Sequence, residues 1–342
     1  MKNPDRHSQT GFPPMALSHL QNASERDWTA RLEAARELEN PCRCCPRQCG
    51  VNRARGERGF CGAATPARVT KAFITYGEEE FLNPAYMLYF SHCNLRCAYC
   101  SQAHAIQPDF AGGEPCRPAA VAADIDAAFA HGDITSLQIL GGEPGCSLSA
   151  AIAVLAELKS AVPIVWNSNL CLTETALELV DACVDFHVAD LKFGDQAECA
   201  ETLCGFPSYW PTVTRNLRKI TPERLLIRHL PLGGHIDCCT RKVIDFIRRE
   251  MPRVPVSFHT LIPDPASRTR SLTGQEQRAL DDMVKTAGLR RLYATLCDSP
   301  ATGRRQSFVS EIVIRKDGAV LAQDLSEPVR NLLSNFNLRP PA

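Results

Sequence analysis

The sequence has no excess of charge of either sign. Its 342 residues include 38 basic and 38 acidic side chains, so the formal net charge is zero. A neutral chain offers little electrostatic attraction to nucleic acid or to an anionic membrane surface. The sequence also lacks any apolar run near the ~18 residues that a membrane-spanning helix needs. We therefore expect neither nucleic acid nor a membrane among the partners of this protein.

The first residues lack the apolar segment of a secretory signal. Residues 1–21 are polar and interrupted by prolines, so no signal peptide is predicted. Cysteine, by contrast, is abundant: there are 17, an odd number in a large chain. Clustered cysteines in a compartment that keeps thiols reduced usually bind metal instead of forming disulfides. We expect a cytoplasmic protein with reduced thiols.

Strand-like apolar runs alternate with helix-like segments from residue 86 onward. This alternation is typical of βα units around a parallel sheet. We predict an α/β fold, a partial, open TIM-like βα barrel of about six units. The predicted strands are 86–90, 136–140, 164–166, 186–189, 225–230, 256–259 and 292–296. The predicted helices are 119–130, 149–160, 173–182, 195–203, 240–249 and 274–286.

The segments on either side of this core differ from it in composition. Ser24 is expected to cap an N-terminal helix that ends at Glu39, before Asn-Pro. Near the C-terminus, residues 311–321 are predicted to form a hairpin with an Asp-Gly turn. The expected division is a tail and helix (1–40), a Cys-rich segment (41–85), the core (86–300) and a small C-terminal β extension (301–342).

Three cysteines follow the first predicted strand at C-x3-C-x2-C spacing: Cys93, Cys97 and Cys100. Cubane iron–sulfur clusters normally take four thiolates, so three leave one iron without a protein ligand. An open metal position is where chemistry can occur, as at catalytic zinc. The spacing alone also fits a structural zinc site or buried thiols. A non-catalytic electron-transfer or structural zinc protein is therefore the alternative to an enzyme.

Polar residues follow the apolar part of each predicted strand of the core. Active sites of βα barrels lie where strands end, so these residues are expected to meet at one mouth. Gly-Gly-Glu-Pro at 141–144 follows a strand, whereas an identical copy at 112–115 does not and is predicted to be a loop. The glycines let backbone approach a ligand and Glu143 adds an acceptor, although a plain turn also fits.

Charged residues at the later strand ends permit more than one interpretation. Asp190 and Lys192 are two residues apart on a strand and therefore share a face, where an ion pair and ligand contact both fit. The Arg228 guanidinium suits a carboxylate. His259 is more often a satisfied core residue than a ligand contact.

The cysteine loop, with the aromatic Tyr99 before its last cysteine, resembles the radical S-adenosylmethionine (SAM) superfamily. The resemblance implies a [4Fe–4S] cluster on the three cysteines, with SAM chelating the unique iron. It further implies reductive cleavage of SAM to methionine and a 5′-deoxyadenosyl radical that abstracts hydrogen from a substrate. An external one-electron donor of flavodoxin or ferredoxin type would supply the electron.

The same resemblance implies the SAM contacts. Gly141-Gly142-Glu143 matches the family's G-G-E motif for the SAM amino group, and Asp-Leu-Lys at 190–192 matches its D-L-K. Asn167 replaces the Asp of a D-T-N motif, which leaves a monovalent cation site one charge short. The complete predicted set is Tyr99, Gly141, Gly142, Glu143, Asn167, Asn169, Asp190, Lys192, Arg228 and His259.

A second cysteine group precedes the core on short Gly- and Arg-rich loops: Cys42, Cys45, Cys49 and Cys61. A zinc ion, an iron–sulfur centre and free thiols packed on the barrel all fit this group. Its C-x2-C-P-R-x-C-G-V and G-x-C-G patterns resemble relatives of pyruvate formate-lyase activating enzyme. That resemblance implies a radical SAM enzyme that activates a glycyl radical partner. Radical modification of a peptide or metabolite without such a partner is the second hypothesis.

The remaining cysteines receive no chemical role from the sequence. Cys238 and Cys239 also match the relatives, but nothing in their spacing explains the pair. The others are predicted to be packing residues: Cys116, Cys146, Cys171, Cys183, Cys199, Cys204 and Cys297.

Overall fold

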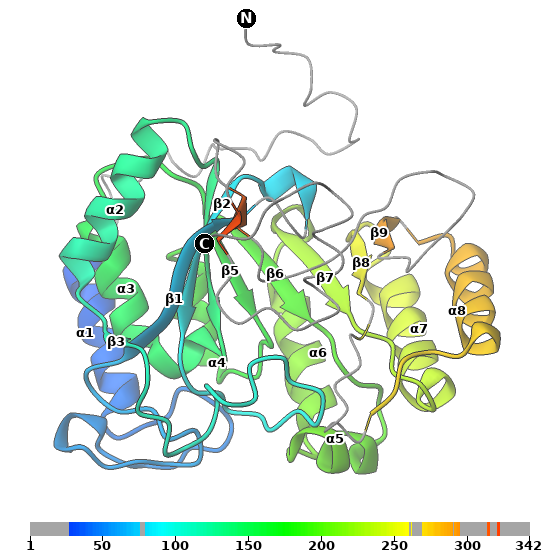
Figure 1. The fold of residues 1–342 in the computed structure, drawn as a ribbon. Coiled ribbons are helices and arrows are strands. Elements are labelled where there is room, and N and C mark those ends of the chain that lie inside the picture. Colours follow the sequence, from blue (N-terminus) through cyan, green and yellow to red (C-terminus); the bar gives the residue numbers. More distant parts are fainter. Residues whose placement is uncertain are drawn as a thin grey trace, which may run out of the picture.

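The computed structural model describes residues 27–75, 79–259, 261, 269–289, 291–294, 313–314 and 320–321. Its strands and helices alternate along the chain (Figure 1). The strands are β1 (Arg68–Thr75), β2 (Ala85–Phe90), β3 (Glu114–Pro115), β4 (Ser136–Gly141), β5 (Ile164–Ser168), β6 (Phe186–Asp190), β7 (Leu225–His229), β8 (Val256–Phe258), β9 (Arg291–Ala294), β10 (Val313–Ile314) and β11 (Val320–Leu321). The helices are α1 (Trp28–Glu39), α2 (Pro118–Ala130), α3 (Leu148–Glu157), α4 (Glu174–Asp181), α5 (Ala197–Cys204), α6 (Tyr209–Lys219), α7 (Arg241–Glu250) and α8 (Gly274–Ala287).

One open sheet organises the described part of the chain. Its nine strands follow the order β3-β1-β2-β4-β5-β6-β7-β8-β9. From β2 across to β9 every neighbouring pair is parallel, whereas β1 runs antiparallel to both β2 and β3. The arrows of β5, β6 and β7 consequently point to the same edge (Figure 1). An α/β fold with an open, mainly parallel sheet is confirmed, and each of the seven predicted core strands corresponds to one of its seven parallel strands.

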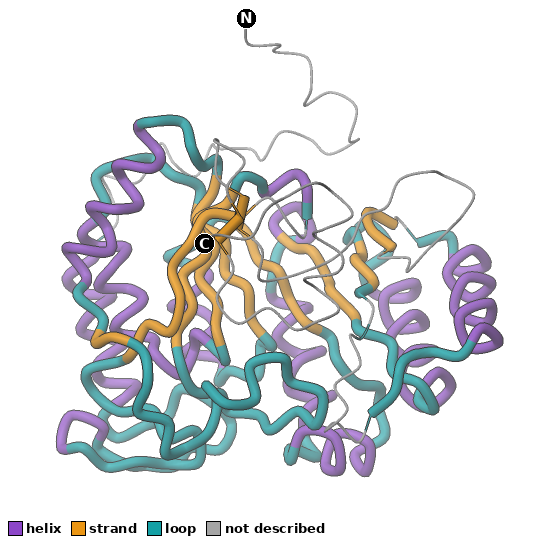
Figure 2. Tube along the Cα trace, viewed as in Figure 1, coloured by secondary structure: helices purple, strands orange, loops and turns teal. Residues whose placement is uncertain are grey.

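The two faces of the sheet have different partners. Helices surround the strands on the outer side (Figure 2), and Trp166 of β5 belongs to the large core that they form with the sheet. Val165, Val188 and Leu226 pack on the opposite, inner face with Leu82 of the short helix η4 (Glu80–Leu82). These apolar residues lie near the beginnings of their strands. Side chains two positions later share the inner face and lie closer to the strand ends.

The observed helices correct two predictions, one about where a helix begins and one about a helix that was not predicted. α1 begins at Trp28 and its N-cap is Asp27, whose carboxylate accepts the Ala30 amide at 2.9 Å; the expected cap, Ser24, lies outside the described residues. No helix was predicted over 209–219, yet α6 occupies it. Its buried Tyr209, Val213 and Leu217 recur every fourth residue, so the helical signal was present in the sequence.

Strand pairing refines the ends of the chain's core. The Gly-Gly-Glu-Pro copy at 112–115, which was predicted to be a loop, ends in the two-residue edge strand β3. β10 and β11 pair antiparallel, as the C-terminal hairpin requires, while its Asp-Gly turn lies outside the described residues. β1 of the Cys-rich segment hydrogen-bonds to β2, so this segment shares the core sheet. No helix within the described ranges is long and apolar enough to cross a membrane.

Candidate functional site

The cysteine loop leaves β2 at the edge where the parallel strands end. It is fastened to the last residues of α5 by two backbone hydrogen bonds, from the Arg96 amide to the Cys204 carbonyl at 2.9 Å and from the Ala98 amide to the Leu203 carbonyl at 2.8 Å. These bonds involve no cysteine side chain. The loop's shape is therefore held by backbone contacts that leave its thiols available.

The three thiols of the loop are close enough to influence one another. Burial, with a smaller contribution from Cys97, raises the pKa of the Cys93 thiol well above its ordinary value, and burial also raises the pKa of Cys97 and Cys100. The Cys93 Sγ accepts the Leu95 amide at 3.4 Å and the Asn169 Nδ2 at 3.7 Å. Such donors stabilise a thiolate, and iron would remove the thiol protons.

Two buried polar atoms beside the cysteines have no hydrogen-bond partner among the described residues. They are the Tyr99 hydroxyl and the His92 Nε2. A buried polar group without a partner costs free energy, so a polar ligand at this place would be stabilising. The ammonium of Lys192 is also near enough to lower the pKa of Cys97 and Cys100, against the larger effect of burial. The donor set and its surroundings fit a cluster with three protein thiolates and a polar co-ligand.

The two glycines of the predicted motif bring β4 against the cysteine loop. A Cβ at Gly141 would lie 2.0 Å from the Phe90 carbonyl oxygen, and a Cβ at Gly142 would lie 2.0 Å from that of His92. The Gly142 amide donates to Phe90 at 2.9 Å, and the next amide, of Glu143, donates to His92 at 2.8 Å. In this structure the glycines thus let the backbone after β4 approach the backbone of the cysteine loop closely. The sequence analysis had expected them to allow a close approach to a ligand.

Glu143 is fully buried and connects β4 to the end of β5. Its carboxylate accepts hydrogen bonds from the Gly145 amide at 3.0 Å, the Ser168 hydroxyl at 2.8 Å and the Asn169 amide at 2.9 Å. Burial outweighs these donors and raises the pKa of Glu143 to about 7. Glu143 therefore positions the segment that carries Asn169, and its contact with the SAM amino group remains a prediction.

The two predicted asparagines occupy different places. Asn167 lies on the inner face and donates to the Gln138 Oε1 at 3.3 Å. Asn169 lies beside the cysteine loop, where its Nδ2 donates to the Asn94 Oδ1 at 2.9 Å as well as to Cys93. The structure therefore brings Asn169 to the cysteines, whereas Asn167 belongs to the sheet interior.

Asp190 and Lys192 form an ion pair with 2.6 Å between the Lys192 Nζ and the Asp190 Oδ2. The predicted ion-pair interpretation is confirmed, and contact with a ligand remains a prediction. Tyr209, which sequence reasoning missed, supports the backbone of both residues: its hydroxyl donates to the Asp190 carbonyl at 2.7 Å and accepts the Lys192 amide at 2.9 Å. α6 thus supplies a positioning side chain to the strand end.

Arg228 and His259 converge on a carboxylate that the sequence analysis did not identify. The Arg228 guanidinium binds both oxygens of Glu79, at 3.1 and 2.6 Å, and the His259 Nε2 lies 3.4 Å from the same group. Glu79 is fully buried, which opposes ionisation, yet Arg228 and His259 hold the pKa of its carboxyl far below the usual range. The carboxylate partner of Arg228 is therefore internal. Glu79 stands in a Glu-Glu-Glu run, a pattern more typical of an exposed surface.

The N-terminal cysteines surround a buried cation. The Arg53 Nη2 lies 2.9 Å from the Cys42 Sγ and 3.8 Å from the Cys61 Sγ. The pKa of Cys42 falls to about 5 through a hydrogen bond from Cys44 and the charge of Arg53, and the pKa of Cys61 falls to about 6 through Cys146 and Arg53.

The four predicted N-terminal ligands do not match a single-ion site. Within the described residues, the donor atoms of Cys42, Cys45, Cys49 and Cys61 do not form a group within 4.8 Å of one another. Two of them, Cys42 and Cys61, instead have their sulfur atoms within hydrogen-bond distance of the Arg53 guanidinium. An iron–sulfur centre, whose ligands stand farther apart than those of one ion, stays a prediction for these cysteines.

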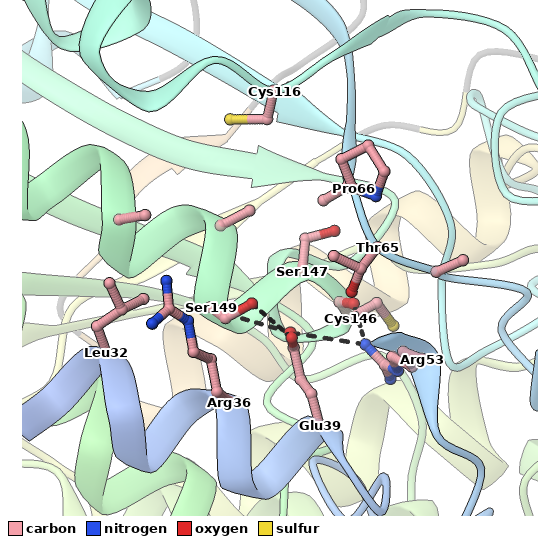
Figure 3. A pocket seen from close by; sticks show the side chains of 14 residues that line it. Leu32, Arg36, Glu39, Arg53, Thr65, Pro66, Cys116, Cys146, Ser147 and Ser149 are labelled. Atoms are coloured by element: carbon pink, nitrogen blue, oxygen red, sulfur yellow. Dashed lines mark hydrogen bonds and ion pairs between the residues drawn. The ribbon is translucent and has the colours of Figure 1, made fainter. Parts of the chain in front are cut away.

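A cavity of about 170 Å³ adjoins Arg53 on the side of α1 and α3 (Figure 3). Glu39 accepts the Ser149 amide at 3.1 Å at its edge and lies 3.7 Å from the Arg53 guanidinium. None of the predicted SAM contacts lines this cavity. We therefore place the candidate site at the strand ends, where the cysteine loop and the inner-face polar groups meet, and not in this cavity.

His229 predicts a pH dependence of stability. It is fully buried, with Nδ1 donating to the Leu191 carbonyl at 2.6 Å and Nε2 3.0 Å from the Thr240 hydroxyl. Burial lowers the pKa of its imidazole to about 4. Below the unfolded value of about 6.5 the unfolded chain binds a proton that the folded chain does not, so the contribution of His229 to stability falls as pH decreases toward 4, by about 2 kcal/mol between pH 7.5 and 5. Urea unfolding at both pH values should show that His229→Gln lacks this loss.

The control for this measurement is His131→Gln, because His131 is exposed at the end of α2. This variant should keep the pH dependence of the unmodified chain. An unchanged pH difference in His229→Gln would contradict the assignment to His229.

Known proteins resemble the chain in sequence and in fold. A family model described as a 4Fe-4S single cluster domain matches residues 85–198. The Uncharacterized protein MJ0674 of Methanocaldococcus jannaschii is 33% identical over 232 residues, which cover 66% of this chain and 67% of that protein.

Several solved structures are also similar. SuiB of Streptococcus suis, bound to S-adenosylmethionine, gives a TM-score of 0.44 at 14% identity over 60% of this chain and 48% of SuiB; the chain thus spans about half the length of SuiB. A radical SAM methyltransferase from Sphaerobacter thermophilus gives 0.45 at 12% identity, with 67% of this chain and 76% of that chain covered. A domain of pyruvate-formate lyase-activating enzyme from Bacteroides vulgatus gives 0.36 at 18% identity, with 46% and 96% covered.

The matched cluster domain contains the whole cysteine loop, including Cys93, Cys97 and Cys100. The [4Fe–4S] cluster predicted from the spacing of these cysteines is therefore supported by an independent comparison. The chain belongs to one family with the M. jannaschii protein.

Proposed function

We propose that this protein is a radical SAM enzyme that cleaves S-adenosylmethionine reductively at a [4Fe–4S] cluster, in a partial TIM-like barrel. The observation that carries the proposal is the place of the cysteine loop. Cys93, Cys97 and Cys100 lie at the edge where the parallel strands end, beside two buried polar atoms without partners and the Asp190–Lys192 pair. When bound, the cluster and SAM supply an electron and a deoxyadenosyl radical for hydrogen abstraction.

The chain's own residues bind and orient these groups. The three thiolates would hold the cluster, and the donors to the Cys93 sulfur, from Leu95 and Asn169, would stabilise its negative charge. Tyr99, whose hydroxyl is buried without a partner, would donate to or accept from SAM. Lys192 and Asp190 would contact the SAM carboxylate and ribose. In each case the protein supplies position and electrostatics, while the cofactors supply the reactivity.

The substrate is proposed to be a glycine of a partner enzyme, in keeping with the N-terminal cysteine pattern. An electron donor of flavodoxin or ferredoxin type is proposed to reduce the cluster. Hydrogen abstraction from another peptide or from a metabolite would use the same site. One observation distinguishes these two hypotheses. If a partner enzyme is activated, a co-purified protein should acquire a single oxygen-dependent backbone cleavage at a glycine; if another peptide or a metabolite is the substrate, it should not.

The testing experiment is anaerobic cluster reconstitution followed by an assay for 5′-deoxyadenosine from SAM under strong reductant. We expect deoxyadenosine from the unmodified chain and none from a Cys93/Cys97/Cys100→Ala triple variant, with iron counted in both. Iron that persists in the triple variant would assign a second cluster to the N-terminal cysteines. Absence of deoxyadenosine, with zinc bound in place of iron, would overturn the proposal in favour of a structural metal protein.

A further inference from the structure

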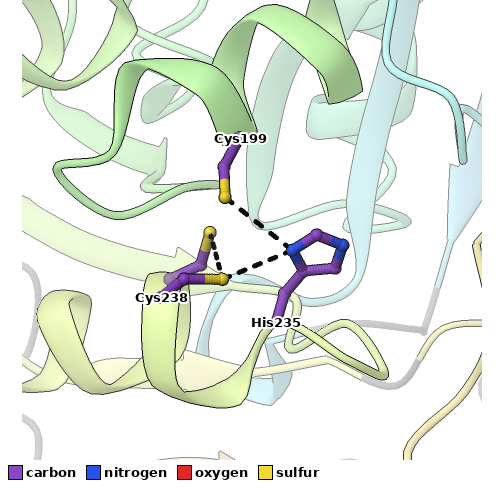
Figure 4. A group of neighbouring side chains, drawn as sticks. Cys199, His235 and Cys238 are labelled. Atoms are coloured by element: carbon purple, nitrogen blue, oxygen red, sulfur yellow. Dashed lines mark hydrogen bonds between the residues drawn. The ribbon is translucent and has the colours of Figure 1, made fainter.

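Four soft donor side chains converge at a place that the sequence left without a role (Figure 4). One comes from α5, one from the loop after β7, and two from the π-helical turn η7 (Ile236–Thr240) that precedes α7. Their donor atoms all lie within 4.8 Å of one another. The residues are Cys199, His235, Cys238 and Cys239.

The distances within this group match the edges of a coordination tetrahedron. With metal–sulfur bonds of about 2.3 Å and metal–nitrogen bonds of about 2.0–2.1 Å, neighbouring ligand atoms stand about 3.6–3.8 Å apart. The His235 Nδ1 lies 3.4 Å from the Cys238 Sγ and 3.9 Å from the Cys199 Sγ. The Cys238 and Cys239 sulfurs are 3.9 Å apart. Little rearrangement would be needed to place one ion among the four atoms.

The size and chemistry of the group select the kind of metal. A donor set this compact suits a single ion, because a cluster of several irons holds its ligand sulfurs farther apart. Three thiols and an imidazole form the Cys3His set of structural zinc sites. Four protein ligands leave no open coordination position. The site is consequently expected to hold structure together and not to bind substrate.

The surrounding backbone is shaped around the two adjacent cysteines. Helices with π-type hydrogen bonding are rare in proteins, and those that occur are frequently found at functional sites. Gly194 lies directly against the turn: a Cβ there would be 2.3 Å from the Cys238 carbonyl oxygen and 2.9 Å from the Cys239 Cα. This close approach holds the backbone of the two adjacent cysteines against the segment that carries Gly194.

The group is connected to the cysteine loop through α5. Cys199 is in the first turn of this helix, and the Leu203 and Cys204 carbonyls at its other end accept the loop amides of Ala98 and Arg96. An ion at Cys199 would therefore fix the first turn of α5 to η7, while the backbone hydrogen bonds hold the other end of the helix to the cysteine loop.

We propose that these side chains form a closed structural zinc site, in which one ion is bound by four ligands: Cys199, His235, Cys238 and Cys239. The site joins α5 to η7 and so supports the helix on which the cysteine loop is fastened. The proposal is independent of the reaction proposed above, and its test does not use deoxyadenosine.

Metal analysis of the full chain tests the proposal. Reduced, chelator-treated protein is loaded anaerobically with Zn²⁺, desalted and analysed for zinc, alongside Cys238→Ala and His235→Ala. Each variant should carry one zinc fewer per chain than the unmodified protein. The matched control is Cys116→Ala, which removes a half-buried thiol outside the group and should retain the full zinc content. Equal zinc in Cys238→Ala and the unmodified chain would overturn the proposal.

A second measurement does not depend on the folding of any variant. Alkylation of the unmodified chain, read by mass spectrometry, should label Cys199 and Cys238 in the chelated protein and leave them protected after zinc loading. Cys116 should be labelled equally in both. Equal labelling of Cys199 and Cys238 with and without zinc would overturn the proposal.

Discussion

A Cys97→Ala variant is expected to lose its cluster iron and all detectable SAM cleavage while remaining folded. One thiolate of three is removed, and two cannot hold a four-iron cluster at an open site. The loop itself should keep its shape, because the Arg96 and Ala98 amides are bonded to α5 through backbone alone. The unfolding free energy should fall by only about 1 kcal/mol. Iron content, deoxyadenosine formation and urea unfolding measure the three quantities.

The control for this variant is Cys204→Ala. Cys204 is buried near Cys97, and its thiol donates to the Ala200 carbonyl at 3.0 Å within α5, so it is a packing residue beside the cluster site. It should retain iron and activity at a similar cost in stability. Activity in Cys97→Ala, or an equal loss in both variants, would contradict the ligand assignment.

Arg228→Ala is expected to lower the unfolding free energy by about 3–5 kcal/mol at pH 7.5. The variant leaves the Glu79 carboxylate fully buried with His259 as its remaining partner in the ion-pair group, and an uncompensated buried charge carries a cost of this size. The deficit should shrink toward pH 5, because without Arg228 the carboxyl group can take up a proton. Denaturant unfolding at both pH values is the measurement.

The matched control is Arg218→Ala, which removes another arginine from a 2.6 Å ion pair. The Arg218–Glu250 pair is exposed, with side chains 50% and 36% accessible, so its loss should change the unfolding free energy by less than about 1 kcal/mol. A double variant, Arg228→Ala with Glu79→Gln, should recover part of the stability lost in Arg228→Ala. Equal small losses in unfolding free energy for both single arginine variants would show that the buried Glu79 carboxylate does not depend on Arg228 for its stabilisation.

The sequence was sufficient for features that depend on local pattern. The parallel strands of the core were predicted close to their observed bounds, because buried strands are short apolar runs ended by polar residues. The cysteine loop and the convergence of polar residues at one edge followed from the same pattern, since all parallel strands end on the same side. The ion pair of Asp190 with Lys192 was one of the two interpretations that their two-residue spacing gave.

Partners far apart in the chain were decided by the tertiary structure. Glu79 meets Arg228 across 149 positions, and nothing near Glu79 in the sequence distinguishes it from the acidic residues beside it. Glu143 lies against Ser168 and the Asn169 amide, two contacts that its motif did not indicate, and its contact with SAM remains a prediction.

The cysteines show the same division most clearly. Spacing identified Cys93, Cys97 and Cys100, because one short loop must reach one cluster. Cys199 lies 36 positions from His235, and only the packing of α5 against η7 brings the two together. At the N-terminus, spacing suggested four ligands, but folding placed the Arg53 guanidinium between Cys42 and Cys61. Sequence determined which side chains can bind metal, and the fold decided which of them share one position in space.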